Sequence, residues 1–178
     1  MINFSQKKGF TLIETLVAIA VLVLAISGAF TAAQSGLSSY QHSKNQAIAI
    51  NLAQEAVEAI RANRDSNILS GNNWMQGMGQ SSDPCYSTDT IPRACILDIS
   101  SVPISISSCG TAGTCPFLRQ NSTTGYYGYN STWPLTVFKR EIQITSITSS
   151  EVSVLVTVTW SKGVSTKQYK TRTYLFDW

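Results

Sequence analysis

A single carboxylate, Glu14, interrupts an otherwise apolar N-terminal segment. Glu14 is the only charged residue between Lys8 and Lys44, and apolar side chains run without interruption from Leu16 to Ile26. A carboxylate in a membrane-spanning helix costs about 2.5–3.5 kcal/mol on insertion scales, so such a residue is a candidate functional group. The spacing therefore indicates a chemical role for Glu14 that compensates for this cost.

The uncharged segment is long enough to cross a membrane as a helix, which takes about 20 apolar residues. Lys7 and Lys8 would hold the N-terminus in the cytoplasm, and the rest of the chain would lie outside, where disulfides persist. An ordinary secretory signal peptide has the same order of a basic and an apolar region, followed by a small-residue cleavage site, here near Ser27 or Ala29. Hydropathy alone leaves both interpretations open.

The residues between the lysines and the apolar segment favour the first interpretation. Residues 7–14 read Lys-Lys-Gly-Phe-Thr-Leu-Ile-Glu, and this run resembles the class III signal of type IV pilins and type II secretion pseudopilins. The resemblance covers residues 7 to about 33. It implies that a prepilin peptidase cuts between Gly9 and Phe10 and then methylates the new amino group of Phe10. Residues 1–9 would be a removed leader, and residues 10–33 a retained transmembrane and assembly helix.

Cleavage there would expose an ammonium group one helical turn from Glu14. In apolar surroundings each charge is unfavourable alone, and an ion pair between them offsets part of the desolvation. Glu14 could pair with the N-terminus of a neighbouring subunit, which would draw that subunit into a fibre and set its register, or with its own N-terminus. We favour the intersubunit pair because the resemblance implies assembly.

The same resemblance implies partners and a location. The partners would be the prepilin peptidase, other pilin or pseudopilin subunits, a pilus assembly platform and membrane lipid before assembly. The chain would cross the cytoplasmic membrane once, with most of its length outside, and then enter an extracellular pilus or a periplasmic pseudopilus. A net charge of +3 is too small to indicate a nucleic-acid partner.

The helix is expected to continue as an amphipathic half over residues 34–65, to about Arg64, with Gly71 beyond its end. Gly28 and Gly36 are candidate weak points, because each costs about 1 kcal/mol relative to Ala. One apolar stripe follows helical spacing: Ala49, Leu52, Ala53, Ala56, Val57 and Ile60. Residues 51–61 also resemble the corresponding stretch of PilV-like minor pilins.

Residues 66–134 are rich in Gly, Ser, Asn and Pro, show no long period and predict a variable loop region. They contain four cysteines, spaced as C-x9-C and C-x5-C: Cys85, Cys95, Cys109 and Cys115. Neither spacing is typical of zinc modules, so we expect no metal site. Four cysteines allow three disulfide connectivities. We favour Cys85 with Cys95 and Cys109 with Cys115, because each pair would close a short loop.

Residues 135–178 predict an antiparallel sheet of three sequential strands, at Leu135–Ile147, Val152–Trp160 and Thr166–Phe176. Ile142 and Ile144 should point inward, between outward Glu141 and Gln143. One face of this sheet would pack on the apolar stripe of the helix, giving an α+β fold. The Tyr and Trp side chains are expected to fill this domain rather than to mark a sugar or DNA site.

No catalytic constellation is present in the sequence. The chain has one histidine, His42, in a polar stretch without a nucleophile partner. The Gly77-Met-Gly79 run lacks the pattern of a phosphate-binding loop. We therefore expect neither an enzyme nor a cofactor, and the interpretation that agrees best with the residues is a minor type IV pilin. The alternatives are a minor pseudopilin of a type II secretion system and a single-pass membrane-anchored binding domain.

Overall fold

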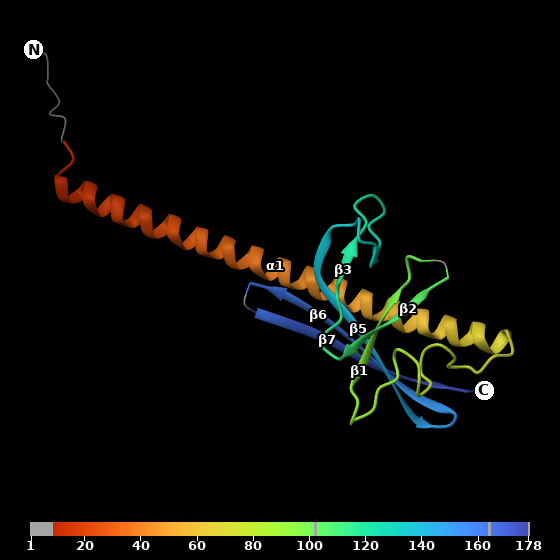
Figure 1. The fold of residues 1–178 in the computed structure, drawn as a ribbon. Helices are drawn as coiled ribbons and strands as arrows, with labels where there is room; N and C mark the ends of the chain where they lie inside the picture. The colour runs from red at the N-terminus through yellow and green to blue at the C-terminus, as the bar shows by residue number, and fades with distance from the viewer. Residues whose placement is uncertain (1–8, 102, 164, 178) are drawn as a thin grey trace, which may run out of the picture. The chain divides into compact units, whose positions relative to one another are not determined.

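A computed structural model describes residues 9–101, 103–163 and 165–177. Within these residues one helix, α1 (Leu12–Leu69), precedes a seven-stranded sheet (Figure 1). The chain divides into two compact units, Met1–Lys44 and Asn45–Trp178, and the second is called the head below. The strands are β1 (Arg93–Asp98), β2 (Ser105–Thr111), β3 (Phe117–Gln120), β4 (Tyr127–Gly128), β5 (Leu135–Thr148), β6 (Glu151–Lys162) and β7 (Ser165–Phe176).

Helix α1, which begins in the first unit, is long and apolar enough to cross a membrane, and none of its most apolar stretch is buried. Gly28 and Gly36, the predicted weak points, both lie within the helix and do not interrupt it. A penalty of about 1 kcal/mol per glycine is small beside the helix preference of the Ala, Leu and other residues around them.

The helix ends at Leu69, five residues beyond the expected limit at Arg64, and a Schellman motif at Gly71 closes it. The N–H of Asn72 donates to the carbonyl of Asn67 at 2.9 Å, and that of Gly71 to the carbonyl of Ile68 at 3.0 Å. Gly71 has a φ of 71°, which the motif requires and a glycine adopts without strain. The Asn67 side chain does not compete with the helix backbone, because its Nδ2 donates to the carbonyls of residues 74 and 76.

Strand β5 is the centre of the head sheet, and every strand pair in this sheet is antiparallel. Along one edge β5 pairs with β6, which pairs with β7 in turn. Along its other edge β5 pairs with β3 near its start and with β1 at Ile142. Strands β2 and β4 extend these two branches. The predicted meander of three sequential strands is confirmed as β5–β6–β7.

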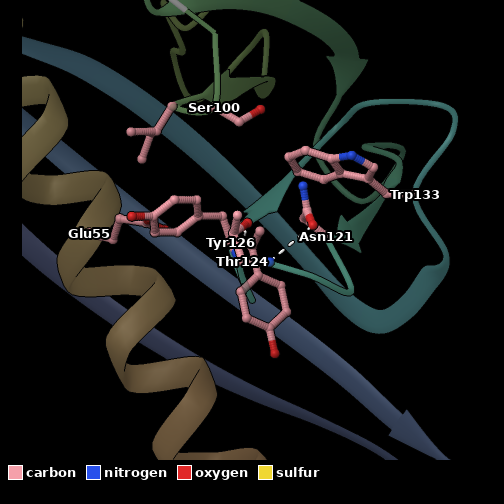
Figure 2. Close-up of a pocket in the computed structure, with 8 residues that line it drawn as sticks. Glu55, Ser100, Asn121, Thr124, Tyr126 and Trp133 are labelled. Atoms are coloured by element: carbon pink, nitrogen blue, oxygen red, sulfur yellow. Dashed lines mark hydrogen bonds between the residues drawn. The ribbon is translucent and has the colours of Figure 1, made fainter.

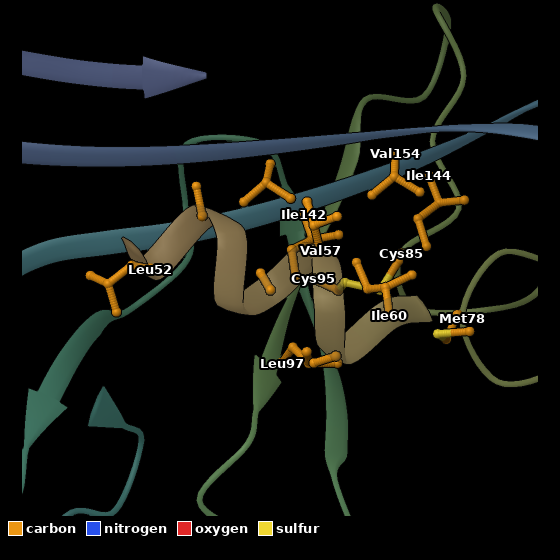
Figure 3. Close-up of a cluster of buried hydrophobic side chains, with 14 of the residues drawn as sticks. Leu52, Val57, Ile60, Met78, Cys85, Cys95, Leu97, Ile142, Ile144 and Val154 are labelled. Carbon is orange, nitrogen blue, oxygen red and sulfur yellow. A yellow bond between two sulfur atoms is a disulfide. The ribbon is translucent and has the colours of Figure 1, made fainter. Parts of the chain in front are cut away.

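The core lies between the sheet and the predicted helical stripe, all six residues of which are buried (Figure 3). Alternate residues of β6 face this core from Val152 to Trp160, and Ile142 and Ile144 of β5 are fully buried, as predicted. Because four of the buried helix positions are alanines, the backbone of α1 can approach the sheet closely. Each fully buried Val, Leu or Ile stabilises the fold by about 1.5–3 kcal/mol.

Residues 66–134 are more ordered than the expected loop region. They contain the last turn of α1 and strands β1 to β4. These strands are short, and β2 has no fully buried residue among its seven. Only Ile106 of β2 packs against the core, so the alternation of apolar and polar residues is too short to predict a strand. Its pairing with β1 is decided by neighbouring strands and not by a local pattern.

One inward position of β5 carries a charge that the sequence analysis did not recognise as buried. Arg140 is fully buried. Its Nη1 donates to Glu55 Oε2 at 2.7 Å and to the carbonyl of Leu52 at 3.2 Å, and its Nη2 donates to the carbonyl of Leu97 at 2.8 Å. A signal was available, because Arg140 has the same parity along the strand as Ile142 and Ile144. The guanidinium joins α1 to β1 through the core.

Candidate processing and assembly site

The helix start lies inside the segment that the class III resemblance identifies. Thr11 caps α1: its Oγ1 accepts a hydrogen bond from the Glu14 N–H at 3.3 Å, and its carbonyl accepts one from the Thr15 N–H at 3.2 Å. Thr at the N-cap and Glu three residues later is the spacing of a capping box. The cap belongs to the chain that would remain after cleavage, so the helix start does not depend on the leader.

Gly9 and Phe10 are exposed immediately before the helix, and 78% of the Phe10 surface is accessible. A Cβ built on Gly9 would meet no atom within 4 Å. The chain itself therefore has no steric need for glycine at this position, and any such need would come from an enzyme that binds the segment. Lys7 and Lys8, the predicted leader charges, lie outside the described residues.

Glu14 occupies the first turn of α1 and is exposed. A carboxylate there interacts favourably with the positive end of the helix dipole. Among the residues that the structure describes, Glu14 forms no ion pair. Phe10 precedes the first helical residue, Leu12, by two positions and Glu14 by four, so an amine at Phe10 would lie close to the turn that carries Glu14. This spacing is compatible with pairing inside one chain and between chains.

The surface around and beyond Glu14 is apolar and accessible. Leu16, Val17, Ile19 and Leu22 each expose between 57% and 58% of their surface. Exposed apolar patches larger than a few hundred Å² mark membrane or protein interaction sites. An apolar surface of this kind is suited to contact with lipid or with other apolar side chains, and Glu14 is its one charged group.

The two disulfides lie in the head and join Cys85 to Cys95 and Cys109 to Cys115. Cys85 and Cys95 are buried in the core and attach the segment before β1 to that strand. The second bridge joins β2 to the segment before β3. Its loop is also held by the Glu141 carboxylate, which accepts hydrogen bonds from the N–H groups of Gly113 and Cys115.

The remaining sequence candidates are not brought together. His42 is exposed on α1, and the described part of the chain contains no group of three or more possible metal ligands. Gly77 has a φ of 79° in a turn, and a Cβ on Gly79 would lie 2.8 Å from Ile144 Cγ2. These two glycines therefore serve a turn that packs on β5.

Comparison with known proteins gives one finding, and it falls on this site. A family model described as the prokaryotic N-terminal methylation motif matches residues 4–30. No curated protein and no solved structure matches the chain. The matched residues contain Gly9, Phe10, Glu14 and the start of α1. This chain therefore carries the N-terminal methylation motif, which supports its placement in the superfamily of type IV pilins and pseudopilins.

Proposed function

We propose that this chain is a minor type IV pilin. Such a structural subunit inserts into the cytoplasmic membrane and then assembles into a fibre through α1. The observation that supports this proposal most is the methylation motif at residues 4–30, which leads into a helix with exposed apolar side chains and Glu14 in its first turn. The helix begins at Leu12, inside the residues that the motif covers.

The proposed sequence of events begins in the cytoplasmic membrane. A prepilin peptidase hydrolyses the Gly9–Phe10 bond and methylates the Phe10 amine, while the apolar part of α1 keeps the chain in lipid. An assembly platform then moves the subunit into the fibre. There the helix exchanges lipid for the helices of other subunits, and Glu14 pairs with the Phe10 ammonium of a neighbour, which offsets the desolvation of both charges.

The head fits this role, because it is held together by a core and two disulfides. Disulfides persist outside the cytoplasm. The two disulfides would limit unfolding of the head once it lies outside the cytoplasm. The proposed role is therefore structural and not enzymatic.

A pseudopilin of a type II secretion system would share the motif and the helix. The resemblance of residues 51–61 to PilV-like minor pilins supports the minor pilin. The two assignments differ in abundance and place. A minor pilin is found in sheared extracellular fibres at a small fraction of the main subunit, whereas a pseudopilin stays with the cell envelope. Quantitative mass spectrometry of sheared fibres and of envelopes separates them.

The test of the proposal is intact-mass analysis of the chain from cells with and without the prepilin peptidase. We expect a mature chain that begins at N-methylated Phe10 in the first case and the uncut precursor in the second. A mature chain that begins at Gly28 would instead indicate an ordinary signal peptide. A mass that does not depend on the peptidase would indicate a plain membrane anchor. Either result would overturn the proposal.

A further inference from the structure

The head contains a cavity of about 370 Å³ that the assembly role does not use (Figure 2). Three aromatic side chains line it, Tyr126, Tyr127 and Trp133. The expectation that Tyr and Trp fill the domain is correct for Trp74 and Trp160, which are buried, but Tyr126 exposes 69% of its surface. Tyr126 is therefore more accessible than packing of the core requires, whereas Tyr127 and Trp133 are partly buried.

The polar atoms in the cavity are held in fixed directions with part of their hydrogen-bonding capacity unused. Asn121 Oδ1 accepts hydrogen bonds from the N–H groups of Thr123 and Thr124 at 2.8 and 3.1 Å, which sets the orientation of the amide and leaves its NH₂ group as a donor. Ser100 Oγ donates to Asp98 Oδ1 at 2.6 Å and keeps its lone pairs as acceptors. The cavity thus offers both donors and acceptors.

Glu55, which lies on α1 across from Trp133 in Figure 2, is the one charged residue among those that line the cavity. Its Oε2 is 2.7 Å from Nη1 of the buried Arg140, so the negative charge is already compensated. Its Oε1 remains an acceptor. A compensated carboxylate attracts a cation much less than a free one, and the cavity is therefore better matched to a neutral ligand that has many hydroxyl groups.

The backbone segments around the cavity are held in place by the protein itself, without a ligand. Arg119 Nη1 donates to the carbonyls of Ser131 and Trp133 at 3.1 and 2.6 Å, which fixes the backbone of the loop that bears Trp133. A Cβ on Gly128 would lie 2.5 Å from Ser100 Oγ, so only glycine lets β4 approach the Ser100 segment this closely. A site that needs little ordering loses less free energy when a ligand binds.

We propose that this cavity binds one pyranose ring of a neutral saccharide. The C–H faces of a pyranose are apolar and pack on aromatic rings, while its hydroxyls both donate and accept hydrogen bonds. Tyr and Trp combine a large apolar face with a polar edge, and pockets from about 300 Å³ upward bind small molecules. This inference does not depend on the proposed assembly role, because all the residues that carry it lie in the head.

The test is saturation-transfer NMR on the full chain in lauryldimethylamine oxide micelles, a detergent without a sugar headgroup. The probes are the methyl glycosides of glucose, galactose, mannose and N-acetylglucosamine, with choline as the cationic comparison. We expect at least one glycoside to bind in the millimolar range and choline to bind more weakly. Binding of choline alone, or of none of the four glycosides, would overturn the proposal.

Variants locate the binding. Trp133→Ala and Tyr126→Ala should each weaken glycoside binding about tenfold, a loss of about 1.4 kcal/mol. Tyr174→Ala is the matched control, since Tyr174 is a half-exposed tyrosine of β7 outside the cavity. Because Tyr126 is well exposed, its removal leaves the core intact even if Trp133→Ala does not fold. Equal binding by Tyr126→Ala and Tyr174→Ala would place the saccharide elsewhere and contradict the proposal.

Discussion

The two units of this chain use the same apolar residue types in opposite ways. In residues 10–44, Leu24 exposes 73% of its surface and Ile26 exposes 60%, whereas in the head Ile142 and Val154 expose none. The head buries its apolar side chains within one chain and is stabilised by them. The N-terminal part of α1 leaves its apolar side chains available for lipid or for other chains.

Because of this difference, substitutions in the two units should have different consequences. A change in residues 9–44 should alter what the chain does with a peptidase, a membrane or another subunit, with no effect on the stability of the head. A change in the head core should alter the free energy of unfolding and leave processing unchanged. The following predictions test this separation, from the largest expected effect to the smallest.

Gly9→Leu should slow conversion of precursor to mature chain by about 10–100-fold, since overpacking a fitted site costs about 1–3 kcal/mol. The head should unfold as in the wild type, because a Cβ at Gly9 meets no atom of this chain. Intact-mass analysis over time measures the conversion. Gly28→Leu, at another glycine with open space around it, is the matched control and should be processed normally. Equal slowing of both variants would contradict the proposed cleavage site.

Replacing Cys85 and Cys95 together by alanine should lower the free energy of unfolding of the head by about 3 kcal/mol, the entropy that a loop of this length gains in the unfolded chain. Denaturant unfolding followed by tryptophan fluorescence measures it. The Cys109 and Cys115 pair, which closes a shorter loop, should cost somewhat less. Processing at Gly9 should proceed normally in both variants. A processing defect in either would contradict the expectation that changes in the head leave processing unaffected.

Stability of the head should fall by about 2–3 kcal/mol between pH 10 and pH 12 because of Tyr129. Burial raises the pKa of Tyr129 to about 12, although nearby Arg140 acts to lower it. The unfolded chain loses this proton near pH 10, so the stabilisation is complete below pH 10 and is lost as the pH rises toward 12. Tyr129→Phe should remove this component of the pH dependence of unfolding, whereas Tyr126→Phe should not. An unchanged pH profile for Tyr129→Phe would show that Tyr129 is not the group responsible.

Glu55→Ala should destabilise the head by about 2 kcal/mol, because it leaves the buried Arg140 guanidinium without its counter-charge. Glu55 is partly exposed, which keeps this value below that of a fully buried pair. Glu58→Ala is the control: it removes the exposed ion pair with Arg61 and should cost at most about 0.5 kcal/mol. Denaturant midpoints of the two variants give the comparison, and similar losses would show that burial of Arg140 does not matter.

Glu14→Gln should lower incorporation into fibres about tenfold, equivalent to about 1.4 kcal/mol, while membrane insertion becomes easier. Glutamine keeps the polar group of the capping box but not the charge. Glu14→Ala removes both, so the difference between the two variants isolates the cap. The ratio of protein in sheared fibres to protein in membranes, at equal expression, measures incorporation. If that ratio stays at the wild-type value in Glu14→Gln, charge pairing is not the assembly mechanism.

The methylation motif is a property of the sequence itself. Local patterns in the sequence were also enough to predict the membrane-length helix, the buried stripe and the β5–β7 meander. Each depends on residues close in the chain: the buried stripe of α1 recurs at steps of one, three and four, and alternate valines of β6 face the core. A helical or strand period records which side of an element is apolar, and an antiparallel meander joins neighbours in sequence through short turns. Such features need little information from distant residues.

Tertiary structure alone decided which strands share the second edge of β5, where Arg140 places its charge, and which aromatic residues border a cavity. Strand β2 has too short an apolar alternation to be predicted, and its pairing with β1 makes it a strand. Arg140 is tolerated in the core because acceptors from Leu52, Glu55 and Leu97 converge on it. These partners are 43 to 88 residues away in the chain. No local period encodes a meeting of groups so far apart, because it exists only once the helix and sheet have packed.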